Sequence, residues 1–258
     1  MKKLFTLAFA LVFSTGLAFA QDNSSEIDQD GDDHTAVVDQ AGSSNEAFIK
    51  QAQTERSKAY QYQTGDENVA SIRTLSGSKS DLYQEQDGDG NTATMDEVND
   101  NIKAYQTQIG NDNTASIAQA RQGNYIDQYQ EGDRNTATFL GHNVPSVRQG
   151  SYTQTQVGND NLAKILGANN KNTVVQTQTG NLNTASITGS NFSQNTLTQT
   201  QTGDNNTATM DLPNVKNNMG TITQTGNGNM ATSDFLSNNN SSTITQNGNS
   251  NMATVTQQ

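Results

Sequence analysis

The sequence contains no cysteine, no tryptophan and only two prolines. Without cysteine, neither disulfides nor thiolate metal sites can hold the chain together. Hydrophobic residues make up 31% and aromatic residues 6% of its 258 residues, which leaves little apolar surface for a conventional core. The same composition is typical of disordered chains, so composition alone leaves disorder open.

Residues 1–20 differ from the rest of the chain. Lys2 and Lys3 precede an apolar run from Leu4 to Phe13, and Ala18-Phe19-Ala20 has the small-x-small pattern of a cleavage site. This arrangement predicts a secretory signal peptide, which is too short for a membrane anchor. We therefore expect the chain from Gln21 onward to leave the cytoplasm and to be secreted.

Acidic side chains outnumber basic ones, and the excess is unevenly distributed. Without residues 1–20 the chain has 26 acidic and 12 basic residues, a net charge of −14, so a nucleic acid is excluded as a partner by repulsion of phosphate. Residues 21–140 hold 22 acidic and 8 basic residues, whereas residues 141–258 hold four of each. We expect Asp66, Asp89 and Asp133 to repel one another, and residues 141–258 to assemble more readily.

The pattern Gln-x-Gly-x-x-Asn-x-Ala occurs in ten full copies. A weaker eleventh copy runs from Gln29 to Ala36, with His34 in the asparagine position. The glycines from Gly42 to Gly248 lie 22 or 23 residues apart, except for one gap of 26. Fixed periods in this range are typical of solenoids. The motif residues are Gln40, Gly42, Asn45, Ala47, Gln63, Gly65, Asn68, Ala70, Gln86, Gly88, Asn91, Ala93, Gln108, Gly110, Asn113, Ala115, Gln130, Gly132, Asn135, Ala137, Gln156, Gly158, Asn161, Ala163, Gln178, Gly180, Asn183, Ala185, Gln201, Gly203, Asn206, Ala208, Gln224, Gly226, Asn229, Ala231, Gln246, Gly248, Asn251 and Ala253.

Alternation of inward and outward residues on both sides of each glycine predicts a strand, a tight turn and a second strand. The position two residues after the motif alanine is apolar in ten of eleven copies and fails only at Ser233. We therefore predict an all-β solenoid of about ten rungs. Rungs about 4.8 Å apart bring each Gln and Asn above its counterpart, so their amides can hydrogen-bond in structural ladders.

The repeats also predict the organisation of the chain. We expect a short N-terminal segment over residues 21–28, followed by a repeat solenoid over residues 29–258. The 26-residue gap leaves four extra residues, and Pro145 cannot donate to a strand ladder. Residues 141–146 are therefore predicted to form a loop insertion.

The motif resembles the curlin repeat of curli fibre subunits, Ser-x-x-x-x-x-Gln-x-Gly-x-x-Asn-x-Ala-x-x-x-Gln, from Gln29 to Gln257. The resemblance implies a secreted functional amyloid whose pilus-like fibres build biofilm matrix and support cell adhesion. It also implies an outer-membrane export pore, accessory factors and a nucleator subunit. The chain resembles a long variant of the major fibre subunit, and a nucleating minor subunit is the alternative.

The chain departs from the curlin pattern at two positions. The leading serine occurs at Ser80, whereas Asn124, Asn172 and Asn195 take its place in three other copies. The trailing glutamine occurs only at four positions, so we expect the glutamine ladder at that position to be interrupted. These four residues are Gln40, Gln51, Gln119 and Gln257.

No motif for catalysis or metal binding is complete. Asp28, Asp30 and Asp32 have the spacing of a calcium loop, as do Asp87, Asp89 and Asn91, but the glycine that such loops require is absent. These acidic residues are better interpreted as keeping strand edges soluble. Neither His34 nor His142 is paired with a nucleophile by spacing. We expect no enzyme activity, no metal and no cofactor.

Two outward-facing patterns suggest possible surfaces. Tyr60, Tyr83 and Tyr105 precede their motif glutamines by three residues, which suggests an adhesive stripe or simply good strand propensity. Regular Thr-x-Thr or Thr-x-Ser pairs resemble those of ice-binding proteins, although the columns break at Glu46, Lys164 and Met230. An ice-binding or adhesive solenoid is therefore an alternative function. The pairs are Thr92/Thr94, Thr114/Ser116, Thr136/Thr138, Thr177/Thr179, Thr184/Ser186 and Thr207/Thr209.

Overall fold

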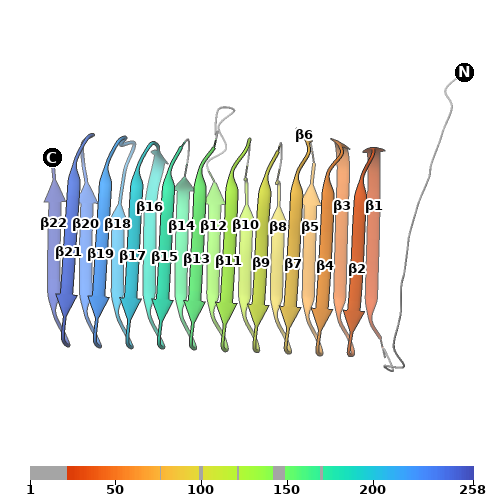
Figure 1. Ribbon diagram of the computed structural model, residues 1–258, viewed down its shortest axis with the longest axis horizontal. Helices are drawn as coiled ribbons and strands as arrows, with labels where there is room; N and C mark the ends of the chain where they lie inside the picture. Colours follow the sequence, from red (N-terminus) through yellow and green to blue (C-terminus); the bar gives the residue numbers. More distant parts are fainter. Residues whose placement is uncertain (1–21, 76, 99–100, 121, 142–148, 169–170) are drawn as a thin grey trace, which may run out of the picture.

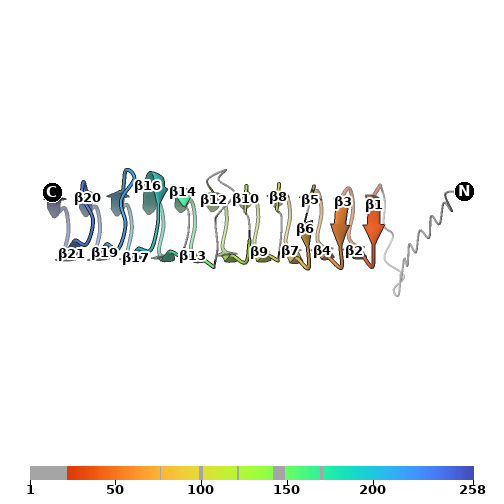
Figure 2. The ribbon, with the colours of Figure 1, turned by 90° about the horizontal axis from the view of Figure 1, so that it is seen from above.

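The computed structural model describes residues 22–75, 77–98, 101–120, 122–141, 149–168 and 171–258. In these residues the chain is all-β, and its strands form two parallel sheets that lie face to face along one axis (Figure 1 and Figure 2). The chain passes from one sheet to the other at every turn. The predicted β-solenoid of about ten rungs is confirmed.

We call the two layers sheet A and sheet B. Sheet A contains β1 (Ser24–Asp32), β3 (Glu46–Glu55), β5 (Val69–Thr74), β8 (Thr92–Asp96), β10 (Thr114–Ala118), β12 (Thr136–Gly141), β14 (Leu162–Ala168), β16 (Thr184–Phe192), β18 (Thr207–Asp211), β20 (Met230–Phe235) and β22 (Met252–Gln257), with β6 (Gly77–Ser78) beside β3. Sheet B contains β2 (Thr35–Ala41), β4 (Lys58–Thr64), β7 (Asp81–Asp87), β9 (Lys103–Ile109), β11 (Tyr125–Glu131), β13 (Ser151–Val157), β15 (Thr173–Thr179), β17 (Thr196–Thr202), β19 (Met219–Thr225) and β21 (Ser241–Asn247).

Each motif copy spans one strand of sheet B, a first corner and one strand of sheet A. In the central copy, β9 is followed by Gly110 and Asp112 in left-handed conformations, and β10 begins at Thr114. A second corner then leads back to sheet B. Neighbouring strands pair in parallel so that equivalent residues of successive copies are partners, for example Gln108 with Gln130 and Ala115 with Ala137. The repeat therefore determines the register of the whole stack.

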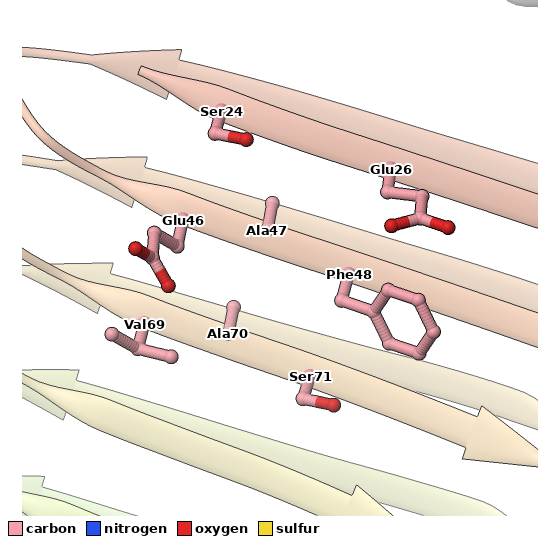
Figure 3. Close-up of a pocket in the computed structure, with 8 residues that line it drawn as sticks. All are labelled: Ser24, Glu26, Glu46, Ala47, Phe48, Val69, Ala70 and Ser71. Carbon is pink, nitrogen blue, oxygen red and sulfur yellow. The ribbon is translucent and has the colours of Figure 1, made fainter. Parts of the chain in front are cut away.

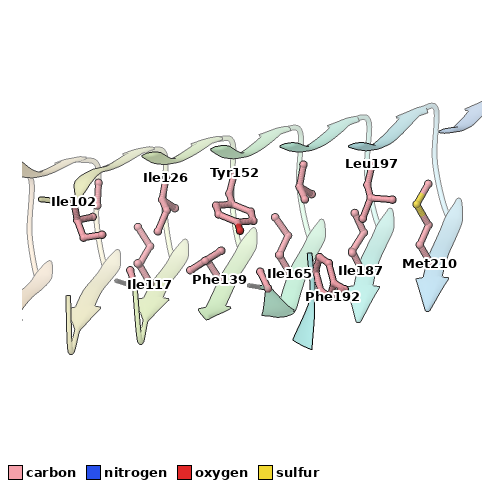
Figure 4. Packing of buried hydrophobic residues seen from close by; sticks show 14 of the residues in the cluster. Ile102, Ile117, Ile126, Phe139, Tyr152, Ile165, Ile187, Phe192, Leu197 and Met210 are labelled. Carbon is pink, nitrogen blue, oxygen red and sulfur yellow. The ribbon is translucent and has the colours of Figure 1, made fainter. Parts of the chain in front are cut away.

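The core is one thin layer between the sheets (Figure 4). From sheet A, the motif alanines alternate with the larger apolar residues two positions later, such as Ile117 and Ile165, which are fully buried. Sheet B contributes residues such as Ile126 and Tyr152, and the ring of Tyr152 lies 4.7 Å from that of Phe139. Small and large residues thus fill the narrow space between the layers.

The exception in the apolar column, Ser233, is explained by its partner across the core. The Ser233 and Ser242 hydroxyls lie 2.8 Å apart in a hydrogen bond, and both residues are buried. Ser242 occupies the sheet B position that Leu197 and Gly220 fill in the preceding rungs. Two serines together can be buried at low cost because each satisfies the other's polar group.

The expected eleventh copy does not form a rung like the others. Gln29 pairs with Gln51 in sheet A, and Ala36 pairs with Ala59 in sheet B. Its turn is therefore a second corner, and Val38 lies in sheet B opposite Gln61 instead of in the apolar column of sheet A. The apolar column begins instead at Ile27, which pairs with Ile49.

Two predicted boundaries can be compared with the strands. The solenoid begins at Ser24 in β1, inside the segment expected over residues 21–28, because β1 pairs with β3 along its whole length. The signal peptide over residues 1–20 and residues 142–146 of the loop insertion lie outside the described residues. Gly141 is the last residue of β12, and β11 pairs with β13 without a shift, so the extra residues do not disturb the register of sheet B.

Candidate functional site

The motif glycines allow the rungs to stack closely at the first corner. Gly110 has a φ of 110°, and a Cβ placed on it would lie 2.2 Å from the carbonyl oxygen of Gly132 in the next rung. The same collision occurs in every copy from Gly42 to Gly226, whereas at Gly248 the closest atom is Asn251 Nδ2 at 3.6 Å. Glycine is therefore required both by conformation and by contact with the next rung.

The motif glutamines form one continuous column of hydrogen bonds. Each Nε2 donates to Oε1 of the glutamine in the following rung at 2.8–3.0 Å, from Gln40 through to Gln246. Its other proton goes to a backbone carbonyl of sheet A at 2.9–3.1 Å, as from Gln108 to Thr92. The amides of this column are buried without loss of hydrogen bonding in the rungs between its ends.

The motif asparagines form a second column with the opposite direction. The backbone N–H of Asn113 and its Nδ2 both donate to Oδ1 of Asn91 in the preceding rung, at 3.0 and 3.1 Å. Asn113 Nδ2 also donates to the carbonyl oxygen of Gly132 at 2.7 Å, the oxygen that approaches Gly110. The same bonds join Asn45 to Asn251, and they tie the corner geometry of one rung to the next.

Another glutamine column, which was not predicted from the sequence, lies two residues before the motif glutamine. Its signal was the Gln-x-Gln pair present in seven copies. The column ends where Val38 precedes Gln61 and where Ile222 follows Gln199, and the buried Oε1 of Gln61 has no partner in the described chain. The column residues are Gln61, Gln84, Gln106, Gln128, Gln154, Gln176 and Gln199, joined at 2.8–2.9 Å.

A fourth column consists of aspartate and asparagine after the motif glycine. Each Oδ1 accepts the backbone N–H of the equivalent residue one rung earlier, as Asp89 accepts from Asp66 at 2.8 Å. The Ser43 hydroxyl and N–H both donate to Asp66, which holds the pKa of this carboxyl below its usual value. Asn111 separates Asp89 from Asp133, so only Asp66 and Asp89 are stacked directly, contrary to the expected run of repelling carboxylates.

The position of the family's leading serine lies at the second corner. There Asn195 donates its backbone N–H to Asn172 Oδ1 at 3.0 Å, Asn218 donates to Asn195 at 2.8 Å, and Asn240 donates to Asn218 at 2.7 Å. Asparagine at this position thus forms a further ladder over the C-terminal rungs. The trailing glutamine Gln51 accepts from Gln29 at 2.7 Å, so this position forms a ladder only at the N-terminal end.

The outward tyrosines lie in one column of sheet B, as expected, but their rings pair diagonally. Tyr62 contacts Tyr83 with a centroid distance of 5.4 Å, and Tyr105 contacts Tyr125 at 5.8 Å. The Tyr83 hydroxyl donates to Glu85, and partial burial together with this carboxylate raises the pKa of Tyr83 to about 12. These rungs therefore present phenols linked to carboxylates rather than a bare aromatic stripe.

Threonine dominates the outer face of sheet B from β13 to β21. One column of direct strand partners consists of Thr155, Thr177, Thr200, Thr223 and Thr245. The pairs predicted from the sequence at Thr92 to Thr138 lie on the outer face of sheet A. Their columns are interrupted in the next strand by Leu162 and Lys164. The threonine surface on sheet B is therefore the longer of the two, and it belongs to the half of the chain with zero net charge.

The described residues contain no group of three or more His, Asp or Glu side chains placed to hold a metal ion. Asp28, Asp30 and Asp32 lie along β1, and alternate residues of a strand are too extended to surround one ion. His34 lies at a second corner, and His142 lies outside the described residues. In the part of the chain covered by strands and corners, no helix is long and apolar enough to cross a membrane.

Comparison with protein families matches the curlin associated repeat to residues 20–52. The matched segment includes β1, β2 and the first full motif copy, from Gln40 to Ala47. A search of curated proteins found no match. The arrangement of glutamine, glycine and asparagine in the matched segment continues through every later rung to β22. The chain is therefore similar to the curlin-repeat family over residues 20–52.

Proposed function

We propose that this structural subunit is secreted and assembles with copies of itself into extracellular, curli-like amyloid fibres that build biofilm matrix and mediate adhesion. The observation that carries this proposal is that the glutamine column has unused hydrogen-bonding groups in the outermost described rungs. Gln246 Nε2 donates only to Met230, and within the described chain nothing donates to Gln40 Oε1. A donor at one end and an acceptor at the other suit a second copy stacked head to tail.

The asparagine column supports the same direction of assembly. Asn251 Oδ1 has no donor among the described residues, whereas the asparagines of interior rungs accept two hydrogen bonds each. The outer edge of β22 is likewise unpaired in the described structure. A parallel edge with matched amide ladders favours addition of an identical chain over any other protein. The similarity to the curlin repeat supports an outer-membrane export pore, accessory factors and a nucleator subunit as further partners.

Two glycine variants test the proposal. Both are made in the chain without residues 1–20. Gly248→Ala places a Cβ where the Gly42 carbonyl of a second copy would stack. At the motif glycines from Gly42 to Gly226, a Cβ in this geometry would lie 2.0–2.3 Å from the carbonyl oxygen of the next rung. Gly228→Ala also places a side chain at a positive φ, 66° compared with 103° at Gly248, but its nearest atom is Ser250 Oγ at 3.7 Å. The parent chain and Gly228→Ala should form dye-binding fibres with reflections near ~4.8 and ~10 Å, and Gly248→Ala should remain monomeric.

A parent chain that stays monomeric at high concentration would contradict the proposed function. Equal fibre formation by the two glycine variants would contradict head-to-tail stacking. Circular dichroism at low concentration provides the control, because both variants should retain the β-rich spectrum of the monomer.

The threonine surface of sheet B supports a second candidate, an ice-binding or adhesive solenoid. Its hydroxyls repeat about 4.8 Å apart along the axis and about 6.6 Å apart along each strand, which is a flat and regular array. Thermal hysteresis of the soluble monomer separates the candidates. Ice binding predicts hysteresis that is lost in Thr200→Lys, whereas a fibre subunit shows none and assembles.

A further inference from the structure

The two sheets differ in which strands lie outermost. Sheet A begins with β1 and ends with β22, whereas sheet B begins with β2 and ends with β21. The described solenoid therefore has a sheet A strand at both of its ends (Figure 1). Among the described residues, no strand of sheet B lies across from β1. This imbalance determines how a second copy can stack on the first.

Stacking that continues both sheets requires two pairings at once. Strand β21 of the second copy must pair with β2, and its β22 must pair with β3, because this is the order of the interior rungs. The edge of β3 that β22 needs is occupied by β1. If β22 paired with β1 instead, one strand position of sheet B would be empty at the junction.

Strand β1 makes the contacts that β22 of a second copy would make. Asn23 Nδ2 donates to the Gly42 carbonyl at 3.1 Å, as Asn45 donates to Gly65, and Gln40 Nε2 donates to the Ser24 carbonyl at 3.1 Å, as Gln63 donates to Glu46. The residues from Asn23 to Gln29 and from Asn251 to Gln257 share the pattern Asn-x-small-x-aliphatic-x-Gln. Strand β1 thus resembles an internal copy of β22.

The sheet B residues that would meet at the junction are complementary. In the register of the interior rungs, β21 on β2 places Gln246 over Gln40 and Ile244 over Val38. The second glutamine column is replaced by aliphatic residues at both ends, so the junction would join aliphatic to aliphatic and amide to amide. This match is lost if β1 keeps its place, because β21 then cannot reach β2.

Strand β1 is also more exposed than the interior strands of sheet A. All of its residues are exposed, and Ile27 has no facing strand to pack against. On the outer face, the carboxylates of Glu26 and Glu46 flank Phe48 on neighbouring strands (Figure 3). Glu26 pairs directly with Phe48 and lies diagonally from Glu46, so the two carboxylates are like-charged neighbours on one face of the sheet. The offsetting charge contact is Lys50 Nζ with Asp28 at 2.6 Å, on the exposed surface.

We propose that β1 is a removable cap on the growing end, and that β22 of a second copy displaces it to pair with β3. This inference rests on the proposed fibre assembly. Until displacement, β1 covers the receiving edge of sheet A and places six acidic residues within residues 22–33 at that end. After displacement, sheets A and B each continue without a gap. The cap lowers the fraction of chains able to accept a second copy, and with it the rate of elongation.

Two variants of the chain without residues 1–20 test the cap on preformed fibre seeds. The first removes residues 22–32. The second carries Ser25→Cys with Ala47→Cys, which face each other on β1 and β3 at the strand spacing of about 4.8 Å that a disulfide can bridge. The control, Thr94→Cys with Ser116→Cys, cross-links two neighbouring strands within the stack at outward-facing positions. The chain has no other cysteine, so each disulfide is unambiguous.

The deletion should accelerate elongation, by about 10- to 1,000-fold if the open form makes up about 0.1–10% of the parent chain. The oxidised β1–β3 cross-link should stop elongation, and reduction of the same sample should restore it. The oxidised control should elongate at the parent rate. If the parent forms fibres and neither the deletion nor the cross-link changes its rate, the cap is wrong while the proposed function stands. If the parent forms none, both are wrong.

Discussion

The same substitution at two positions of one column should have very different costs. Gln128 lies inside the second glutamine column: its Oε1 accepts from Gln106 at 2.8 Å, and its Nε2 donates to Gln154 at 2.8 Å and to the Ser116 carbonyl at 3.1 Å. Gln128→Ile leaves one N–H of Gln106 and the Oε1 of Gln154 buried without partners. At about 1–3 kcal/mol for each unsatisfied group, the cost is about 2–6 kcal/mol.

Gln199→Ile is the matched control. Gln199 is the last member of the column, and its strand partner in the next rung is already Ile222. The substitution moves the end of the column back to Gln176 without creating an additional end. Both glutamines are fully buried in sheet B, so the apolar gain from isoleucine is similar and cancels in the comparison. We expect Gln199→Ile to change the free energy of unfolding by less than about 1 kcal/mol.

Urea unfolding of the soluble monomer measures both variants against the parent, provided that the slope of the transition is unchanged. Amide hydrogen exchange locates the effect, which for Gln128→Ile should centre on β9 to β13 because each rung contacts only its neighbours. Equal destabilisation by the two substitutions would refute the reasoning, since it would mean that the neighbouring amides recover partners and that a continuous column adds nothing.

Three further predictions concern the corners and the core. Gly110→Ala should lower the free energy of unfolding by more than about 3 kcal/mol, because its Cβ meets the Gly132 carbonyl, whereas Gly228→Ala should cost only about 1–3 kcal/mol of strain, both measured by urea unfolding. The pKa of Asp66 is lowered in the folded chain, so its ionised carboxylate stabilises the fold at pH values above the usual pKa of 3.8. This contribution is lost as the pH falls through the lowered pKa. Asp66→Asn keeps an acceptor, so its unfolding midpoint should fall less than that of the parent between about pH 5 and pH 2; an identical fall would contradict this assignment. Ser242→Ala should cost about 1–3 kcal/mol by leaving the Ser233 hydroxyl unpaired, and adding Ser233→Val should recover most of it in thermal unfolding.

Much of this fold was predictable because one repeat unit determines one rung. Alternation around the motif glycine predicted the strands, and the fixed spacing placed each amide over its equivalent. The column from Gln61 to Gln199 was not predicted, although the Gln-x-Gln pairs are visible in the sequence. A residue two positions before the motif glutamine lies on the same face of the strand, so it had to be buried as well.

The N-terminal end was harder to predict, for a physical reason. The eleventh copy has the residues of a first corner, yet it forms a second corner, since both corners use left-handed residues between two strands. Spacing in the sequence cannot show whether a corner leads from sheet A to sheet B or from sheet B to sheet A, unless the strands before it have already been assigned to sheets. The pairing of Ser233 with Ser242 likewise depends on contact across the core, which residues nine positions apart in the sequence do not indicate.

The contrast between the acidic rungs and the threonine-covered rungs has a consequence for the material that such chains would form. Ten rungs at about 4.8 Å each give a subunit length of about 48 Å. Head-to-tail assembly would repeat the acidic residues 21–140 and the neutral residues 141–258 in alternating bands along the filament. Such a filament is an electrostatic block copolymer. Filaments lying side by side would avoid aligning their acidic bands, and polycations in the surrounding matrix would decorate them at intervals of about 48 Å.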